Sequence, residues 1–253
     1  MEFSPGTFTP APQRASVAAM AMAQGRIESK LMLRHGEQML LSLIIPAAIL
    51  IAAVKVPVFG ADTTLDELVP MVFAIAAASA GFTGQAISLA FDRRYGALKR
   101  SGASGVPTWT IIAGKIIAVF TTVIIQILVL GSIAFLLGWQ VSVSGAVLGI
   151  VALFLGVAAF TSLGLLLGGT QSSEIVLAVS NLIWFLLLGI VGWVVYSGLL
   201  GTPGVWDLVP SVALASAMTG ALHGLIHTSA WLSLLAWAVA AIAGTIRWFR
   251  FDG

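Results

Sequence analysis

The sequence predicts an all-α membrane protein with six transmembrane helices, an amphipathic N-terminal helix on the cytoplasmic surface and a re-entrant outer segment between the fifth and sixth helices. Three observations lead to this fold class. Hydrophobic residues make up 59% of the 253 residues and charged residues only 9%, whereas a soluble chain is about 25% charged. Six apolar stretches are long enough to cross a bilayer. The basic residues gather on one side of those stretches.

The six spans follow from length, because crossing about 30 Å of hydrocarbon takes roughly 20 apolar residues. Their approximate bounds are 38–56, 68–90, 110–138, 145–168, 175–199 and 228–248. The first span contains Pro46, and a proline is tolerated there when a neighbouring helix satisfies the carbonyl that it frees. The same span ends at Lys55, whose long stem can carry its ammonium group to the membrane surface.

A seventh apolar stretch, residues 205–222, has the length of a span but contains Asp207 and Pro210. Counting it as a span would place Arg247 and Arg250 on the side opposite the other cations. We therefore interpret it as part of an outer segment, residues 200–227. We expect a pair of half-helices that dip into the outer leaflet.

Lysine and arginine fix the orientation, since the cytoplasmic loops of membrane proteins carry an excess of both. The N-terminal segment, the 91–115 connection and the C-terminal end hold eleven of the twelve basic residues, and only Lys55 falls on the other side. We therefore expect a multi-pass protein of the cell (plasma) membrane, with both termini in the cytoplasm.

The N-terminal part consists of a polar tail, residues 1–15, and an amphipathic helix, residues 16–36, ahead of the transmembrane domain, residues 37–253. Basic residues recur every four positions on one side of this helix, while apolar residues occupy another side. These basic residues are Arg26, Lys30 and Arg34. Such a helix lies along the membrane with its cations against lipid phosphates. A second interpretation adds contact with a cytoplasmic partner.

Motifs for bound cofactors are missing from the sequence. It has no Gly-x-x-x-x-Gly-Lys-[Ser/Thr] loop for ATP, no His-Glu-x-x-His zinc motif and no cysteine. The three histidines cannot meet at one metal, because His35 lies on the cytoplasmic side and His223 and His227 on the outer side. We therefore expect no metal or cofactor on this chain, no enzymatic activity and no nucleic-acid partner.

One short motif suggests an enzyme and is rejected. Residues 102–105, Gly-Ala-Ser-Gly, match the Gly-x-Ser-Gly of rhomboid intramembrane proteases. Ser104 lies in a charged cytoplasmic connection, however, and no predicted span contains a histidine to activate it. A serine nucleophile without a base within hydrogen-bond reach is inert.

Polar side chains inside the spans are few, and four of them are candidates for lining a transport pathway. They are Gln85, Ser88, Gln126 and Asn181. The alternative role of the three amides is hydrogen bonding between helices. The spans lack the chain of charges that a proton- or sodium-coupled carrier needs. A transporter built from this sequence would therefore take its energy from elsewhere.

The connection at residues 91–109 concentrates charge between two apolar spans. We expect the second span's helix to continue past Phe91 and carry residues 92–94 out of the bilayer. Tyr95 and Gly96 then allow a turn into a short surface helix. There Leu98 would form an apolar knob ringed by basic residues. Such a loop binds either lipid headgroups or another protein.

Residues 92–115, DRRYGALKRSGASGVPTWTIIAGK, resemble the first cytoplasmic loop of type-2 ABC transporter permeases, the membrane subunits of export-type ATP-driven transporters. The matching positions are Asp92-Arg93, Gly96-Ala97-Leu98, Pro107 and Gly114-Lys115. The chain departs from the family pattern at Ala97, where threonine is usual, in lacking a second acidic residue, and at Ser101-Gly102. The order of amphipathic helix, six spans and proline-containing outer segment is similar as well.

This resemblance implies a transport subunit driven by a separate ATPase, present in two copies, which binds ATP and Mg²⁺. The residues that would couple the chain to it are Arg93, Arg94, Tyr95, Gly96, Leu98, Lys99 and Arg100. Leu98 and Tyr95 would supply a buried anchor within a basic rim. The resemblance also implies pairing with a second permease subunit, identical or a sister, to give twelve spans.

The cargo is less sharply defined. Apolar walls with scattered amides suit an amphiphilic cargo such as a drug, an antibiotic or a lipid-like molecule. Permeases of the haem- or polysaccharide-export branches are alternatives within the family. A structural or assembly subunit that moves nothing is the alternative outside it.

Overall fold

The computed structural model describes residues 15–56, 58–60, 62–103 and 107–249, apart from the side chains of 101–103 and 108. Within these ranges no strand occurs, and six helical runs are long and apolar enough to cross a membrane. They are Gly36–Lys55, Leu65–Arg94, Trp109–Leu136, Val143–Thr170, Ser173–Tyr196 and Thr228–Trp248. The predicted all-α fold class with six long apolar helices is confirmed.

The first two spans are each interrupted by a π-helical turn. The first consists of α2 (Gly36–Met39), η1 (Leu40–Ile44) and α3 (Ile45–Lys55), and the second of α4 (Leu65–Ala77), η2 (Ala78–Thr83) and α5 (Gly84–Arg94). The other four spans are α7 (Thr108–Leu136), α8 (Val143–Thr170), α9 (Ser173–Tyr196) and α11 (Thr228–Trp248). Outside the spans lie α1 (Val17–Arg34), α6 (Ala97–Ala103), the 3-10 turn η3 (Val205–Leu208) and α10 (Pro210–Leu222).

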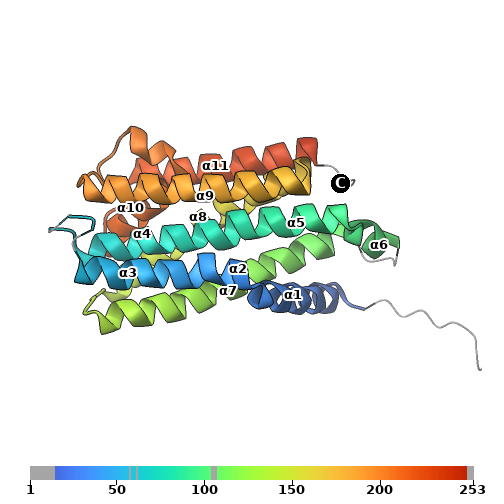
Figure 1. Ribbon diagram of the computed structural model, residues 1–253, viewed down its shortest axis with the longest axis horizontal. Helices are drawn as coiled ribbons and strands as arrows, with labels where there is room; N and C mark the ends of the chain where they lie inside the picture. Colours follow the sequence, from blue (N-terminus) through green and yellow to red (C-terminus); the bar gives the residue numbers. More distant parts are fainter. Residues whose placement is uncertain (1–14, 57, 61, 104–106, 250–253) are drawn as a thin grey trace, which may run out of the picture.

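The spans lie side by side along the length of the molecule (Figure 1). At the right-hand end of Figure 1 lie α1, α6 and the last turn of α11, while the turns after α3 and α7 lie at the left-hand end with α10. The segments rich in lysine and arginine therefore share one end of the bundle. That this end is cytoplasmic stays a prediction, as does the division of the chain at residues 15 and 36.

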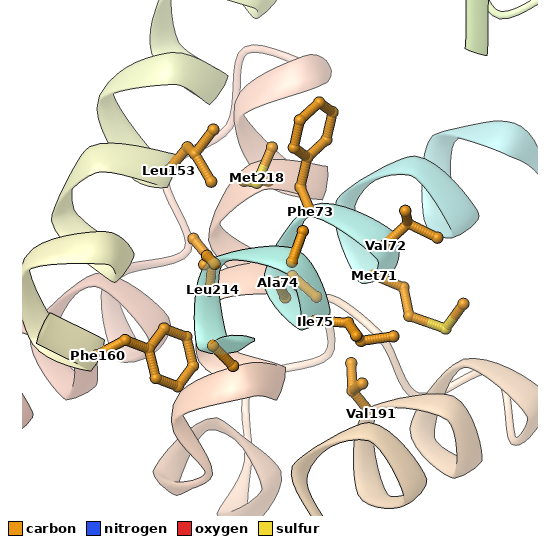
Figure 2. Packing of buried hydrophobic residues seen from close by; sticks show 14 of the residues in the cluster. Met71, Val72, Phe73, Ala74, Ile75, Leu153, Phe160, Val191, Leu214 and Met218 are labelled. Carbon is orange, nitrogen blue, oxygen red and sulfur yellow. The ribbon is translucent and has the colours of Figure 1, made fainter. Parts of the chain in front are cut away.

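The core forms around the second span. Every residue of α4 from Leu68 to Ala77 is buried. Figure 2 shows side chains of α4 between α8, α9 and α10. The labelled ones are Met71, Val72, Phe73, Ala74 and Ile75 of α4, Leu153 and Phe160 of α8, Val191 of α9, and Leu214 and Met218 of α10. The second span is therefore an interior element of its own subunit.

The outer segment differs in form from the expected pair of half-helices. It contains one four-residue 3-10 turn and one helix, α10, of 13 residues. A helix of that length rises about 20 Å, too little to cross about 30 Å of hydrocarbon. All residues from Pro210 to Ala221 are buried, and α10 packs on α4, α8, α9 and α11. Because its residues are mostly small or aliphatic, the segment folds into the bundle. Its depth in the membrane stays a prediction.

Side chains from neighbouring helices satisfy the carbonyls that two prolines free. Pro46 has no N–H for the carbonyl of Ser42, and Gln126 of α7 donates its Nε2 to that oxygen at 3.1 Å. Pro70, inside α4, likewise frees the carbonyl of Asp66, to which the Thr219 hydroxyl of α10 donates at 3.4 Å. A neighbouring helix therefore satisfies the carbonyl that Pro46 frees, as a proline inside a span requires.

Candidate coupling helix and adjoining cavity

The charged connection forms a helix, a turn and a second short helix where the sequence predicts them. The helix of the second span ends at Arg94, and α6 begins at Ala97. Between them Gly96 has a φ of +66°, a conformation that glycine adopts without steric cost. The chain then enters the third span at Thr108. The turn therefore projects α6 from the end of the bundle.

Leu98 does not form the exposed apolar knob that the sequence suggested. Its side chain is 7% exposed and packs with Leu89 and Ile111. A short surface helix gains most by burying its one large aliphatic side chain against the spans. Leu98 therefore holds α6 on the bundle, and any contact of this residue with a partner would require α6 to move.

Two of the basic residues are also engaged within the chain. Arg93 is 5% exposed, and its guanidinium donates to the carbonyls of Gly168 and Gln171, both at 2.9 Å. These carbonyls lie at the C-terminal end of α8, where helix carbonyls lack partners within the helix. Arg94 forms an ion pair with Glu174 at the start of α9. Both arginines therefore tie α5 to the turn between α8 and α9.

The outward side of the turn carries an aromatic ring and two cations. Tyr95 is 63% exposed, and Lys99 and Arg100 are also exposed. The Tyr95 ring stacks on Phe91 with 5.9 Å between ring centroids, and the Arg100 guanidinium donates to the Tyr95 carbonyl. Because tyrosine and arginine are enriched at protein interfaces, this side of the turn has the composition of a docking surface.

A buried lysine joins the same region to the N-terminal helix. Lys115 of α7 is 1% exposed, and its Nζ lies 2.6 Å from Asp92 Oδ2 and 3.3 Å from Glu28 Oε2. The ammonium group also donates to Ser88 Oγ at 2.7 Å. A buried charge is tolerated only when it is paired and hydrogen-bonded. The cluster of Lys115, Asp92 and Glu28, here called the ionic cluster, therefore links α1, α5 and α7.

Two glycines allow α1 to lie directly against the third span. A Cβ at Gly114 would overlap Gln24, and a Cβ at Gly25 would overlap Ile117. These contacts explain the Gly114-Lys115 pair in the sequence. The glycine leaves room for α1, and the lysine forms an ion pair with Glu28 of that helix. The predicted basic residues of α1 remain exposed, and they are Arg26, Lys30 and Arg34.

The four pathway candidates fall into different surroundings. Gln85 and Ser88 line a cavity of about 460 Å³ beside α1 and α2. Gln126 is buried between helices and donates to two backbone carbonyls, and Asn181 donates to Leu177 O of its own helix at 3.0 Å. The structure therefore brings Gln85 and Ser88 together and leaves the other two apart. A role of any of them in transport stays a prediction.

Sequence reasoning missed the roles of Glu28, Asp92 and Lys115. A signal was present, because an ionisable residue near a membrane span almost always has a partner. The partner could not be named, since Glu28 and Lys115 are separated by 87 residues. Three parts of the sequence predictions lie outside the described residues, namely residues 1–14 of the polar tail, Ser104 and Arg250.

The described residues form a bundle with six helices long and apolar enough to cross a membrane, and a helical turn lies at its basic end. The family profile of the ABC-2 type transporters matches residues 22–228 of the chain. Since this is most of the sequence, the chain belongs to the ABC-2 type transporter family and is a type-2 ABC transporter permease. Comparison with curated proteins gave no match, and neither did comparison with solved structures.

Family membership also identifies the kind of transport system to which the chain belongs. It is the membrane component of an ABC transporter, a system that includes an ATPase partner. The six long apolar helices agree with a multi-pass protein. The role of the chain is transport.

Proposed function

We propose that this chain is the permease subunit of an ATP-driven exporter in the plasma membrane, with both termini in the cytoplasm. A separate ATPase subunit, in two copies per complex, binds ATP and Mg²⁺ and drives the cycle. It docks on the turn between α5 and α6. The permease forms half of the translocation pathway for an amphiphilic substrate, and a second permease subunit, identical or a sister, forms the other half.

The proposal rests on how buried and exposed side chains are arranged around α6. Leu98 and Arg93 are buried and fix the turn to the bundle, while Tyr95, Lys99 and Arg100 face outward. An exposed aromatic ring with cations beside it offers a partner both an apolar anchor and a charged rim. Because α5 is the last part of the second span and ends at this turn, a movement of the turn is transmitted to the centre of the subunit.

The outer surface of α9 supports pairing with a second permease subunit. Its exposed large side chains include Leu182, Phe185, Leu186 and Trp193. The second span is buried in its own subunit. A pathway between two subunits therefore draws its walls from the exposed side of α9 and from neighbouring spans.

The experiment uses the ATPase that co-purifies with the wild-type chain from its native membrane. Arg100→Glu replaces an outward cation by an anion, and Tyr95→Ala removes the aromatic anchor. We expect each variant to retain about tenfold less ATPase, a change of about 1.4 kcal/mol in binding free energy. The measurement is the amount of ATPase and the rate of ATP hydrolysis per permease after purification.

The matched control is Arg247→Glu, an identical charge reversal on an exposed residue at the same end of the bundle. This variant should retain the ATPase at the wild-type level, because Arg247 lies on α11. Equal retention by Arg100→Glu and Arg247→Glu would contradict docking at α6. Absence of any ATPase in the wild-type preparation would contradict the proposal as a whole.

A further inference from the structure

The cavity beside the ionic cluster has the size of a ligand site. Its volume is about 460 Å³, within the range of roughly 300–1,000 Å³ that is typical of ligand pockets. It lies where the corner between α1 and α2 faces α5, and Ala118 of α7 and Leu177 of α9 complete its lining. This corner is at the basic end of the bundle, which we assign to the inner leaflet.

Negative charge predominates in the lining. Glu28, Glu37 and Asp92 all line the cavity. Glu28 and Asp92 share the single ammonium group of Lys115, and Glu37 has no ion-pair partner among the residues that the structure describes. The lining contains no lysine or arginine, and His35 is the one further titratable group among the described lining residues. Three carboxylates thus face one ammonium group, and the cavity favours a cation.

Apolar side chains form the rest of the wall. The large apolar residues among them are Leu31, Met32, Leu41, Ile87, Phe91 and Leu177. Phe91 contributes an aromatic ring to the lining, and aromatic rings attract cations. Met32 adds a flexible thioether that adapts to irregular shapes. A ligand that satisfies both parts of this lining has an apolar body and a positive group.

A buried amide inside the cavity has an unfilled hydrogen bond. Gln85 lines the cavity and is only 3% exposed. Its Nε2 donates to the Met32 sulfur at 3.6 Å, while its Oε1 has no partner. A buried amide oxygen without a donor is unfavourable. The oxygen itself is enclosed, so a small rotation of the Gln85 side chain toward the cavity is needed before a ligand N–H group can supply that donor. A partner of this kind is an ammonium group with a hydrogen to donate.

We propose that this cavity binds a cationic amphiphile whose positive group is a protonated amine. As the cargo class of the permease this assignment rests on the proposed function, whereas binding itself does not. The anionic cytoplasmic leaflet concentrates such molecules beside α1. Glu37 attracts the ammonium group, Gln85 Oε1 accepts a hydrogen bond from it, and the apolar body contacts Phe91 and Leu177.

The test measures binding to the full chain in nanodiscs of zwitterionic lipid, without the ATPase. Three probes share one dansyl fluorophore on a five-carbon chain and differ only in the terminal group: a primary ammonium (dansylcadaverine), a trimethylammonium and a neutral acetamide. Fluorescence above that of empty nanodiscs reports binding. We expect the primary ammonium to bind most tightly, the trimethylammonium less tightly and the acetamide least.

Two variants assign the site. Glu37→Gln should weaken dansylcadaverine binding by about fivefold, the upper end for an exposed ion pair, and leave the acetamide probe unchanged. Gln85→Leu should abolish the preference for the primary ammonium over the trimethylammonium probe. Asp62→Asn, which removes an exposed carboxylate at the other end of the bundle, is the matched control and should bind all three probes as the wild type does.

The outcomes separate this proposal from the proposed function. Equal affinity for the three probes, or equal weakening by Glu37→Gln and Asp62→Asn, would overturn the site even if Arg100→Glu still released the ATPase. Conversely, the expected order of probes would support the site even if no ATPase were found. Unchanged thermal unfolding of Glu37→Gln shows that its lost affinity does not come from misfolding.

Discussion

Two polar clusters connect the second span of the bundle to its neighbours, one through charged groups and the other through neutral amides. The ionic cluster joins α1, α5 and α7 through Lys115. Eleven residues further along α7, about 16 Å of helix, Gln126 donates to Ser42 O and Ala76 O. Nearer the cavity, which it helps to line, Gln38 donates to Ser79 O at 2.8 Å. We call the glutamines and these carbonyls the amide cluster.

The difference shows how depth in the membrane selects polar chemistry. Near the end of the bundle a charge is tolerated, because three partners surround Lys115 and lipid headgroups lie close by. In the middle, neutral amides donate to backbone carbonyls, one of which, that of Ser42, is freed by Pro46. Ionic partners can be exchanged for water or phosphate, whereas a freed carbonyl in hydrocarbon has no substitute. We therefore expect α1 and α6 to move about a fixed middle.

The largest effect should come from breaking the ionic cluster. Lys115→Met removes the only ammonium group that Glu28 and Asp92 contact among the described residues. We expect a loss of about 3–5 kcal/mol in the free energy of unfolding, since two carboxylates are left without compensation. The measurement is denaturant-induced unfolding in detergent micelles.

A second substitution sharpens that result. Adding Asp92→Asn to Lys115→Met removes one of the uncompensated charges, so the double variant should be more stable than the single one. If the two variants have the same free energy of unfolding, the loss reflects packing of the lysine stem. The ionic cluster is then not what joins the helices.

Breaking the amide cluster should cost less. Gln126→Leu leaves the carbonyls of Ser42 and Ala76 without their donor, and we expect a loss of about 2 kcal/mol. In a Pro46→Ala background the new backbone N–H can reach Ser42 O, so the same substitution should cost about half as much. Unfolding of the wild type, the two single variants and the double variant in micelles gives this comparison. Strictly additive losses would show that Gln126 does not compensate for the proline.

Local patterns in the sequence predicted much of the fold. Runs of apolar residues located the six spans, and Gly96 with its charged neighbours located the turn before α6. The direction of Leu98 was not predictable, because a seven-residue helix is too short for its periodicity to show which side is buried. Arg93 was expected on the rim, yet its long side chain reaches back to the end of α8.

The partners across the bundle escaped prediction for a different reason. Which carboxylates meet Lys115 depends on how α1 docks on α7, and that docking depends on Gly25 and Gly114 at distant positions. Glycines of this kind are common in membrane helices and do not name their partner. The cavity, likewise, exists only because α1 and α5 converge, so no segment of sequence describes it.

The smallest effect should come from an ion pair outside both clusters. Arg94 and Glu174 form a direct pair, but their side chains are 48% and 65% exposed. Water screens such a pair, so Arg94→Gln should lower the free energy of unfolding far less than Lys115→Met does. That small loss should shrink further in high salt. A loss as large as that of Lys115→Met would mean that charge alone, and not burial, sets the strength of these contacts.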